Sequence, residues 1–185
     1  MKKRIINREF FTKAAKEVAY NLVGKFIYSK ENQEEYMITK TESYCPDEKD
    51  YNGHSFCYGI KKETGEKSKT RATLPLFGEP GTWCVYGGQL LLSVTNNEEP
   101  YNVLIKEIKA SNGKIYTTDG IAEVLRLYQK FSDSNYWHFH GLYSLSDEAT
   151  LYLMENSEAQ EINIKCRKRK NIKNDEKCQF YIDGE

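Results

Sequence analysis

Two side chains with catalytic potential, Glu42 and Tyr44, lie two positions apart in the segment Thr41-Glu42-Ser43-Tyr44. On a β-strand, residues two apart project from the same face and lie roughly 7 Å from each other. A carboxylate would then stand beside an aromatic ring, which suits activation of water next to a flat substrate stacked on that ring. On the spacing alone, an exposed Glu on an edge strand beside a half-buried Tyr is the favoured alternative.

The Cys and His residues do not favour a metal site. Structural zinc sites usually contain close pairs such as Cys-x-x-Cys, and the spacing of Cys45, His54 and Cys57 lacks that regularity. Cys166 and Cys178 are interpreted as ordinary thiols. The sequence also contains no glycine-rich phosphate loop and no Gly-x-Ser-x-Gly elbow. We therefore predict a site with no metal and no cofactor.

Length and composition predict a single domain over residues 1–185, with 27 basic and 27 acidic side chains and 39% hydrophobic residues. A chain of this length buries enough surface to fold without disulfides or a structural metal. There is no charged-then-apolar leader and no run of about 18 apolar residues, so we expect neither secretion nor membrane spanning. We expect reduced thiols and a cytoplasmic location, in association with the nucleoid if the source is bacterial.

The charge is unevenly distributed along the chain. Zero net charge removes the simplest argument for nucleic-acid binding, which is a globally basic protein. Residues 1–30 and 161–178 are nevertheless rich in Lys and Arg, whereas residues 31–58 are rich in Asp and Glu. Local basic stretches can contact phosphates, because charges beyond a Debye length of about 8 Å are screened. On charge alone a solvated surface is favoured, and DNA binding requires both basic stretches to converge on one face.

Hydrophobic spacing predicts the helices that must support such a site. Apolar residues over 11–22 recur at helical spacing, with Thr12 as the expected N-cap and Gly24 as the stop. A second amphipathic helix is expected to open near Asp119 and to include residues 121–131.

Alternation of apolar and polar residues predicts several β-strands. The strongest local prediction is a hairpin in which Gly87-Gly88 joins residues 82–86 to residues 89–95 in a two-residue turn. The stretch Tyr136-Trp137-His138-Phe139-His140 is compatible with a groove lining, although a packed strand or turn is favoured. Further strands are expected at residues 25–30, 36–44, 103–109, 150–154 and 178–182. The order of elements predicts an α+β domain with a mostly antiparallel sheet.

Several segments, taken in order, resemble a known family. They are Glu9-Phe10-Phe11, Leu22-Val23-Gly24-Lys25, Thr41-Glu42-Ser43-Tyr44, His54-Ser55, Pro80-Gly81-Thr82-Trp83-Cys84-Val85-Tyr86, Val103-Leu104-Ile105-Lys106, residues 147–155 and Gln179-Phe180-Tyr181-Ile182. Together they resemble the alkyladenine (methylpurine) type of DNA-3-methyladenine glycosylase, over almost the whole chain from about Arg8 to Gly184.

The resemblance implies a monofunctional, metal-independent enzyme of base excision repair, acting as a monomer on damaged or alkylated purines in double-stranded DNA. Such an enzyme flips the nucleotide out of the duplex, because the glycosidic bond cannot be reached inside the stack. Glu42 would be the general base for the attacking water, and Tyr44 would stack on the base. His54 would lie beside or across from the base, and Tyr86 would form a second wall. The implied fold is a single α+β domain with a curved sheet, flanking helices and a protruding β-hairpin.

The sequence departs from the family pattern at the hairpin of residues 81–95, which is shorter than usual. Tyr86 therefore corresponds either to the pocket tyrosine or to the tyrosine that wedges into the minor groove. If Tyr86 is the pocket wall, Gly87-Gly88 forms a tip without a wedge, and Gln89 or Leu90 is the candidate replacement.

Other departures affect the pocket. The family's pocket asparagine and arginine are replaced by Ser93 and Lys106, and the loop after His54 offers Arg71 in place of an Arg-Asn pair. DNA contacts are predicted for Gly87, Gly88, Gln89, Leu90, Arg71, Arg167, Lys168 and Arg169. Two alternatives remain: a non-catalytic DNA- or nucleotide-binding relative that keeps the fold, and a small α+β interaction domain. Glu42 argues against a pure binding module, which has no use for a carboxylate in a base pocket.

Overall fold

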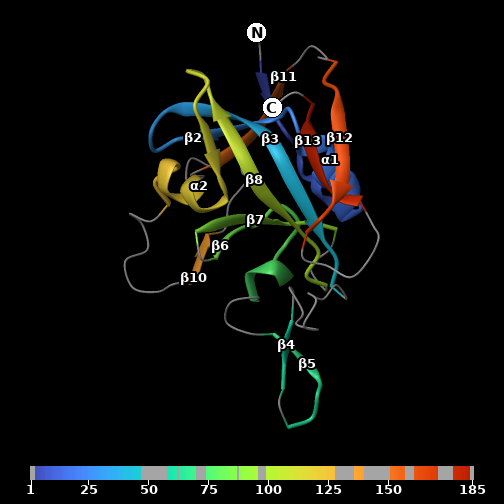
Figure 1. The fold of residues 1–185 in the computed structure, drawn as a ribbon. Helices are drawn as coiled ribbons and strands as arrows, with labels where there is room; N and C mark the ends of the chain where they lie inside the picture. The colour runs from blue at the N-terminus through green and yellow to red at the C-terminus, as the bar shows by residue number, and fades with distance from the viewer. Residues whose placement is uncertain are drawn as a thin grey trace.

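One large antiparallel sheet organises the computed structural model (Figure 1). The structure describes residues 3–46, 58–61, 63–69, 74–86, 88–95, 99–127, 136–139, 151–156, 161–170 and 177–183. The strands are β1 (Lys3–Ile5), β2 (Phe26–Ser29), β3 (Glu34–Tyr44), β4 (Gly59–Ile60), β5 (Lys67–Ser68), β6 (Trp83–Tyr86), β7 (Gln89–Ser93), β8 (Asn102–Ala110), β9 (Ile115–Thr117), β10 (Tyr136–Phe139), β11 (Leu151–Asn156), β12 (Ile164–Lys168) and β13 (Lys177–Ile182). The helices are α1 (Ala15–Leu22) and α2 (Thr118–Val124), with 3₁₀ turns η1 (Arg8–Thr12) and η2 (Leu74–Phe77).

The sheet has 11 strands, with the main order β1-β11-β2-β3-β8-β7-β6-β10. Strand β13 pairs with β3, β12 pairs with β13, and β9 pairs with β8. The long strand β3 thus contacts β8 on one side and both β2 and β13 on the other. The sheet is curved and the helices flank it (Figure 1), which confirms the predicted α+β class.

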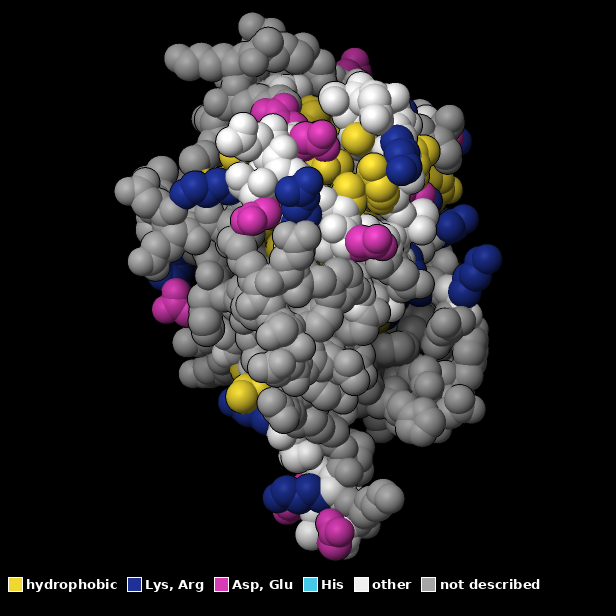
Figure 2. Space-filling view, turned by 90° about the vertical axis from the view of Figure 1, so that its left-hand side faces the viewer, with side chains coloured by type: hydrophobic (Ala, Val, Ile, Leu, Met, Phe, Trp, Pro, Cys, Tyr) yellow, Lys and Arg dark blue, Asp and Glu magenta, His cyan; other side chains and the backbone are white. Residues whose placement is uncertain are grey.

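The hairpin that projects from the sheet is β4–β5, not the one at Gly87-Gly88 (Figure 1). Figure 2 shows charged side chains at the end of this projection, where exposed Lys61, Glu63, Glu66 and Lys67 lie. The predicted two-residue hairpin is confirmed, since Tyr86 pairs with Gln89. This β6–β7 hairpin belongs to the large sheet, because β7 also pairs with β8, and β6 also pairs with β10.

All the strands predicted from alternation are present, with ends shifted by one or two residues. Strand β12 was not predicted, because it consists mainly of exposed Lys and Arg and shows no apolar alternation. The short strands β1 and β9 also escaped prediction. The aromatic stretch forms β10 against β6, as the favoured interpretation required, whereas His140 lies outside the described residues. Helix α2 ends at Val124, so the prediction that the helix continues is wrong for residues 125–127, and residues 128–131 lie outside the described part of the chain.

Helix α1 buries Ala15, Val18, Ala19 and Leu22, the apolar face that the spacing predicted. The expected N-cap at Thr12 is wrong. Thr12 lies in the 3₁₀ turn before the helix, where its hydroxyl donates to the Glu9 carbonyl at 3.0 Å, and Ala14 takes the N-cap position. Gly24 follows the helix with a φ of +85°, a conformation that glycine adopts without strain.

The buried hydroxyl of Thr41 connects α1 to β3. It donates to the Ala19 carbonyl at 2.7 Å, one of the last carbonyls of the helix. Because Thr41 and Glu42 are adjacent on a strand, their side chains point to opposite faces. Thr41 therefore anchors the helix-covered face directly behind Glu42.

An irregularity between β3 and β8 changes which side chains share a face. Ile38 pairs with Ile108 and Thr41 pairs with Ile105, so the paired positions advance by three residues on each strand. Because the side chains at both paired positions face the core, the two residues that lie between these positions on each strand share the opposite face. This accounts for the contacts of both Thr39 and Lys40 with Glu107.

Replacement of Thr41 by Val tests this anchor. Val keeps the shape of Thr but leaves the buried Ala19 carbonyl without its donor, so we expect a loss of about 1–2 kcal/mol in unfolding free energy. Chemical denaturation measures the change. The matched control is Thr12→Val, because the Thr12 hydroxyl makes the same kind of bond on the exposed surface. Equal losses in the two variants would show that the buried bond has no special role.

Candidate active site

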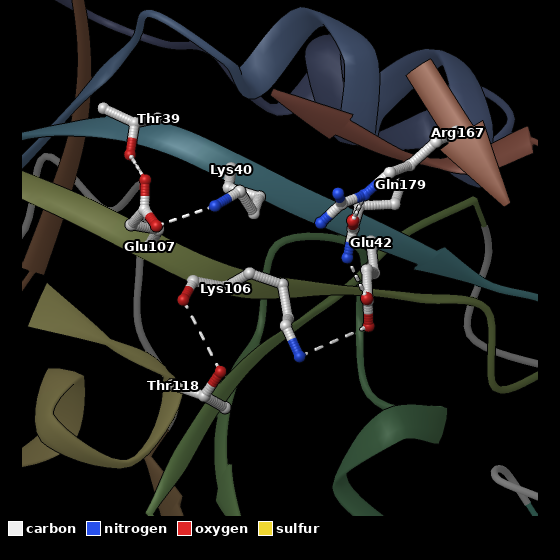
Figure 3. A network of polar contacts seen from close by, with 8 residues as sticks. All are labelled: Thr39, Lys40, Glu42, Lys106, Glu107, Thr118, Arg167 and Gln179. Atoms are coloured by element: carbon white, nitrogen blue, oxygen red, sulfur yellow. Dashed lines mark hydrogen bonds and ion pairs between the residues drawn. The ribbon is translucent and has the colours of Figure 1, made fainter. Parts of the chain in front are cut away.

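Three side chains from adjacent strands lie in a row across the sheet. Arg167 on β12 is directly opposite Gln179 on β13, and Gln179 is directly opposite Glu42 on β3. The Nε–H of Arg167 donates to the amide oxygen of Gln179, and the amide nitrogen of Gln179 donates to Oε1 of Glu42 (Figure 3). Opposite residues on one face are close enough for such contacts. The strand register therefore produces the row directly.

The second oxygen of Glu42 has different neighbours. The Tyr44 hydroxyl donates to Oε2 at 3.0 Å, and the Lys106 ammonium lies 3.8 Å from the same oxygen. Glu42 is only 6% exposed. A buried carboxylate is stable where it is paired and hydrogen-bonded, and here it accepts from Gln179 and Tyr44 beside a cation. Both oxygens of Glu42 thus accept a hydrogen bond.

Arg169 covers one face of the Tyr44 ring. Its guanidinium carbon lies 3.9 Å from the ring centroid, and the residue is only 5% exposed. Burial and then the negative charge of Glu42 raise the pKa of the Tyr44 hydroxyl above its usual value, while the positive charge of Arg169 acts in the opposite direction. Tyr44 therefore remains a neutral hydroxyl that can donate to Glu42.

These side chains line a cavity of about 590 Å³ between β3, β8 and the β12–β13 pair. Its wall also includes Lys40, whose ammonium lies 2.7 Å from Glu107. The cationic lining residues are Lys40, Lys106, Arg167, Arg169 and Lys170, and the carboxylates are Glu42 and Glu107. Among the described residues the cavity is thus rich in positive charge, with a single carboxylate at its most buried end and another paired with Lys40.

The whole chain can now be compared with known proteins. The sequence model of the methylpurine-DNA glycosylase (MPG) family matches residues 9–185. The chain belongs to this family. No individual curated protein matches it. Membership in the methylpurine-DNA glycosylase family confirms the resemblance seen in the sequence and places the chain among the DNA glycosylases, hydrolases of base excision repair whose partner is DNA.

The structure brings some of the predicted site residues together. Glu42, Tyr44, Lys106, Gln89, Arg167 and Arg169 all line the cavity. Lys168 is exposed on β12 beside it. His54, Arg71 and Gly87 lie outside the described residues, as does the side chain of Tyr86, so the role of Tyr86 as pocket wall or wedge stays open.

Other predicted residues are not among those that line this cavity. Leu90 is completely buried in the hydrophobic core. The Ser93 hydroxyl lies 3.0 Å from the Leu76 carbonyl oxygen and 3.1 Å from that of Gly78, so it holds the η2 segment against β7. Gly88 forms part of the turn, with a φ of +86°.

Gln179 was not predicted as a site residue, although it contacts Glu42 directly. The only hint in the local sequence is that Gln179 is polar and stands between the buried residues Cys178 and Phe180. On a strand, its side chain then points to the face opposite the core. The pairing of β13 with the middle of β3 had to be known before that face could be assigned to the site.

Among the described residues, no group of three or more His, Cys, Asp or Glu is arranged to hold a metal ion. No helix in the described ranges is long and apolar enough to cross a membrane.

Replacement of Tyr44 by Phe tests the electrostatics of the site. The pKa of Tyr44 is higher in the folded chain than in the unfolded chain, where it is near 10. Neutral Tyr44 therefore contributes to stability at pH values below about 10, and this contribution is lost as the pH rises toward the pKa of the folded state. Above about pH 10, the unfolding free energy of the unmodified protein should therefore fall by up to about 1.4 kcal/mol per pH unit more than that of Tyr44→Phe. Denaturant titrations at several alkaline pH values measure both slopes. Identical slopes would show that Tyr44 ionises as readily in the folded chain as in the unfolded one.

Proposed function

We propose that this protein is a monofunctional DNA glycosylase that hydrolyses the N-glycosidic bond of alkylated or otherwise damaged purines flipped out of DNA. The observation that carries the proposal is the buried Glu42 carboxylate, held by Gln179 and Tyr44 at the wall of a cavity. Membership in the methylpurine-DNA glycosylase family supports it. The cavity volume of about 590 Å³ falls within the range usual for small-ligand pockets.

In the proposed reaction Glu42 is the general base. It accepts a proton from water as the water oxygen bonds to C1′ of the flipped nucleotide. The N-glycosidic bond breaks, and its electron pair leaves with the base. The products are a free purine and an abasic site in the DNA. A base that carries a positive charge after alkylation is already a good leaving group, so a single base-catalysed step is sufficient for it.

Tyr44 is proposed to contact the flipped base. Arg169 already covers one face of the ring, so the base would use the other face or lie against the guanidinium. Planar guanidinium groups stack on nucleobases much as aromatic rings do. The base, the Tyr44 ring and the Arg169 guanidinium would then lie in one stack next to Glu42.

The positive charge that would meet DNA phosphates comes from the sheet around the cavity. Lys168 and Lys170 are exposed beside it. The basic residues near the N-terminus form separate ion pairs, including Lys13 with Glu17 at 2.7 Å and Lys25 with Glu155 at 2.6 Å. None of the described cavity-lining residues comes from residues 1–30. The convergence of both basic stretches expected from the sequence is thus not seen among the described residues at the cavity, and we assign phosphate contacts to the β12 edge alone.

Replacement of Glu42 by Gln is the central test of this function. The amide preserves shape but cannot accept the proton, so we expect excision to slow by about a hundredfold to ten-thousandfold while duplex binding is kept. Release of base from duplexes that each carry one alkylated or deaminated purine measures the rate.

The matched control is Glu107→Gln, which alters the other carboxylate of the same cavity. Glu107 is bonded to Lys40 and Thr39, so its loss should affect stability and leave excision within a few-fold. An unmodified protein that binds DNA but excises no purine would favour the non-catalytic alternative. A Glu42→Gln variant that keeps most of its rate would remove Glu42 from the mechanism.

The hairpin predicts a dependence on DNA context. A Gly-Gly turn has no side chain to fill the gap left by a flipped nucleotide, and unstacking costs a few kcal/mol. Leu90 is buried in the core, and Gln89 faces the cavity. We therefore expect faster excision of one given lesion in mismatched or single-stranded DNA than in a perfect duplex.

Excision rates in the three contexts decide this point, with Gln89→Ala as the companion variant. Equal rates, or a preference for the perfect duplex, would show that another residue supplies the wedge. If the unmodified protein prefers the perfect duplex and the Gln89→Ala variant does not, Gln89 supplies the wedge.

A further inference from the structure

We propose that Arg167 is a positioning residue for Glu42 and acts through the side-chain amide of Gln179. This inference rests on the proposed role of Glu42 as general base. It assigns to Arg167 a function in the chemical step, beyond any contact with DNA phosphate.

The two ends of the Gln179 amide differ in what they can bind. Its oxygen can only accept hydrogen bonds, and its nitrogen can only donate them. Arg167 has donors and no acceptor, so the amide oxygen must face Arg167. The nitrogen is then directed at Oε1 of Glu42. The reverse orientation would place an amide oxygen against a carboxylate and an amide nitrogen against a guanidinium, and both contacts are repulsive.

The position of Arg167 is itself fixed by β13. Its guanidinium carbon lies 5.2 Å from the centre of the Tyr181 ring, two residues along the strand from Gln179. A guanidinium over an aromatic face at this distance is attracted to it. Arg167 is also directly opposite Gln179 in the pairing of β12 with β13, just before a register shift at Lys168. Backbone pairing and the aromatic ring together hold the donor where the Gln179 oxygen needs it.

The consequence for Glu42 is geometric. Gln179 fixes Oε1, and the Tyr44 hydroxyl fixes Oε2 at 3.0 Å, so the carboxylate plane cannot rotate freely. An ionised carboxylate offers about four lone-pair sites, and these two bonds leave others for water. A misplacement of about 1 Å in a catalytic group can cost a hundredfold in rate. Without Arg167 the amide can turn, and Glu42 loses one of its two fixed points.

The test combines Arg167→Lys, Arg167→Met and Gln179→Met with the double variant Arg167→Met/Gln179→Met. Single-turnover excision at saturating enzyme measures the chemical step, and a separate titration measures duplex affinity. We expect both Arg167 variants to slow excision by about tenfold or more, because Lys keeps the charge but lacks the Nε–H donor. The double variant should be no slower than Gln179→Met alone, because Arg167 acts through the amide. Arg126→Met, which removes an equal charge from an exposed position after α2, is the control.

The opposite results would overturn the proposal. If Arg167→Lys excises normally and Arg167→Met weakens only duplex affinity, Arg167 is a phosphate contact. If the effects of Arg167→Met and Gln179→Met multiply in the double variant, the two residues act independently.

A readout that needs no excision separates this inference from the proposed function. The side-chain NH₂ of Gln179 gives an ¹H–¹⁵N signal that is identified by its loss in Gln179→Met. We expect its protons to exchange slowly in the unmodified protein and in Arg126→Met, and several-fold faster in Arg167→Met. Unchanged exchange in Arg167→Met would refute the orienting role, whether or not the protein excises purines. Absence of excision in the unmodified protein, together with faster exchange in Arg167→Met, would instead refute the proposed function alone.

Discussion

The register of β3 against its neighbours is the constraint on which the candidate active site depends. Glu42 pairs with Gln179 on one side and with Leu104 on the other. In a sheet, a slip of one residue moves every side chain to the opposite face. A slip of β13 alone would replace Gln179 with the buried Cys178 or Phe180, and a slip of β3 would replace Glu42 with Thr41 or Ser43. The polar contacts at Glu42 are therefore a direct product of pairing between distant segments.

The hydrophobic core supplies the energy that fixes this register. On the face opposite Glu42, Thr41 bonds to α1 and Ile105 is completely buried. One fully buried large apolar side chain stabilises the fold by about 1.5–3 kcal/mol, so the many side chains of the core together far exceed the gain of about 0.5–1.5 kcal/mol from a single polar contact across the cavity. The irregular pairing between Ile38 and Thr41 lets both core residues stay buried while Thr39 and Lys40 turn to Glu107. Packing on the buried face of the sheet thus determines where the polar side chains of the opposite face lie.

Local patterns in the sequence predicted what depends on neighbours along the chain. The pair Glu42 and Tyr44, the Gly87-Gly88 turn and the buried face of α1 follow from spacings of two to four residues. The stacking of Arg169 on Tyr44 and the contact of Gln179 with Glu42 join residues more than a hundred positions apart. Strand β12 has charged residues at most positions, so its pairing is decided by backbone bonds to β13 and carries no hydrophobic signal. Local pattern also fails at short range for Thr12. Its hydroxyl donates to the Glu9 carbonyl within a 3₁₀ turn and so does not cap helix α1.

The identity of the group that touches Glu42 has a chemical consequence. A guanidinium in direct contact could bind both carboxylate oxygens at once and leave fewer lone pairs for water. Gln179 instead places a neutral amide at Oε1 and keeps the cation of Arg167 one side chain away. Lys106 forms an ion pair with Oε2 at 3.8 Å, which is longer than a normal hydrogen bond. Each oxygen of Glu42 thus has a neutral hydrogen-bond donor, Gln179 at Oε1 and Tyr44 at Oε2, and this arrangement orients the carboxylate for the general-base role proposed for it.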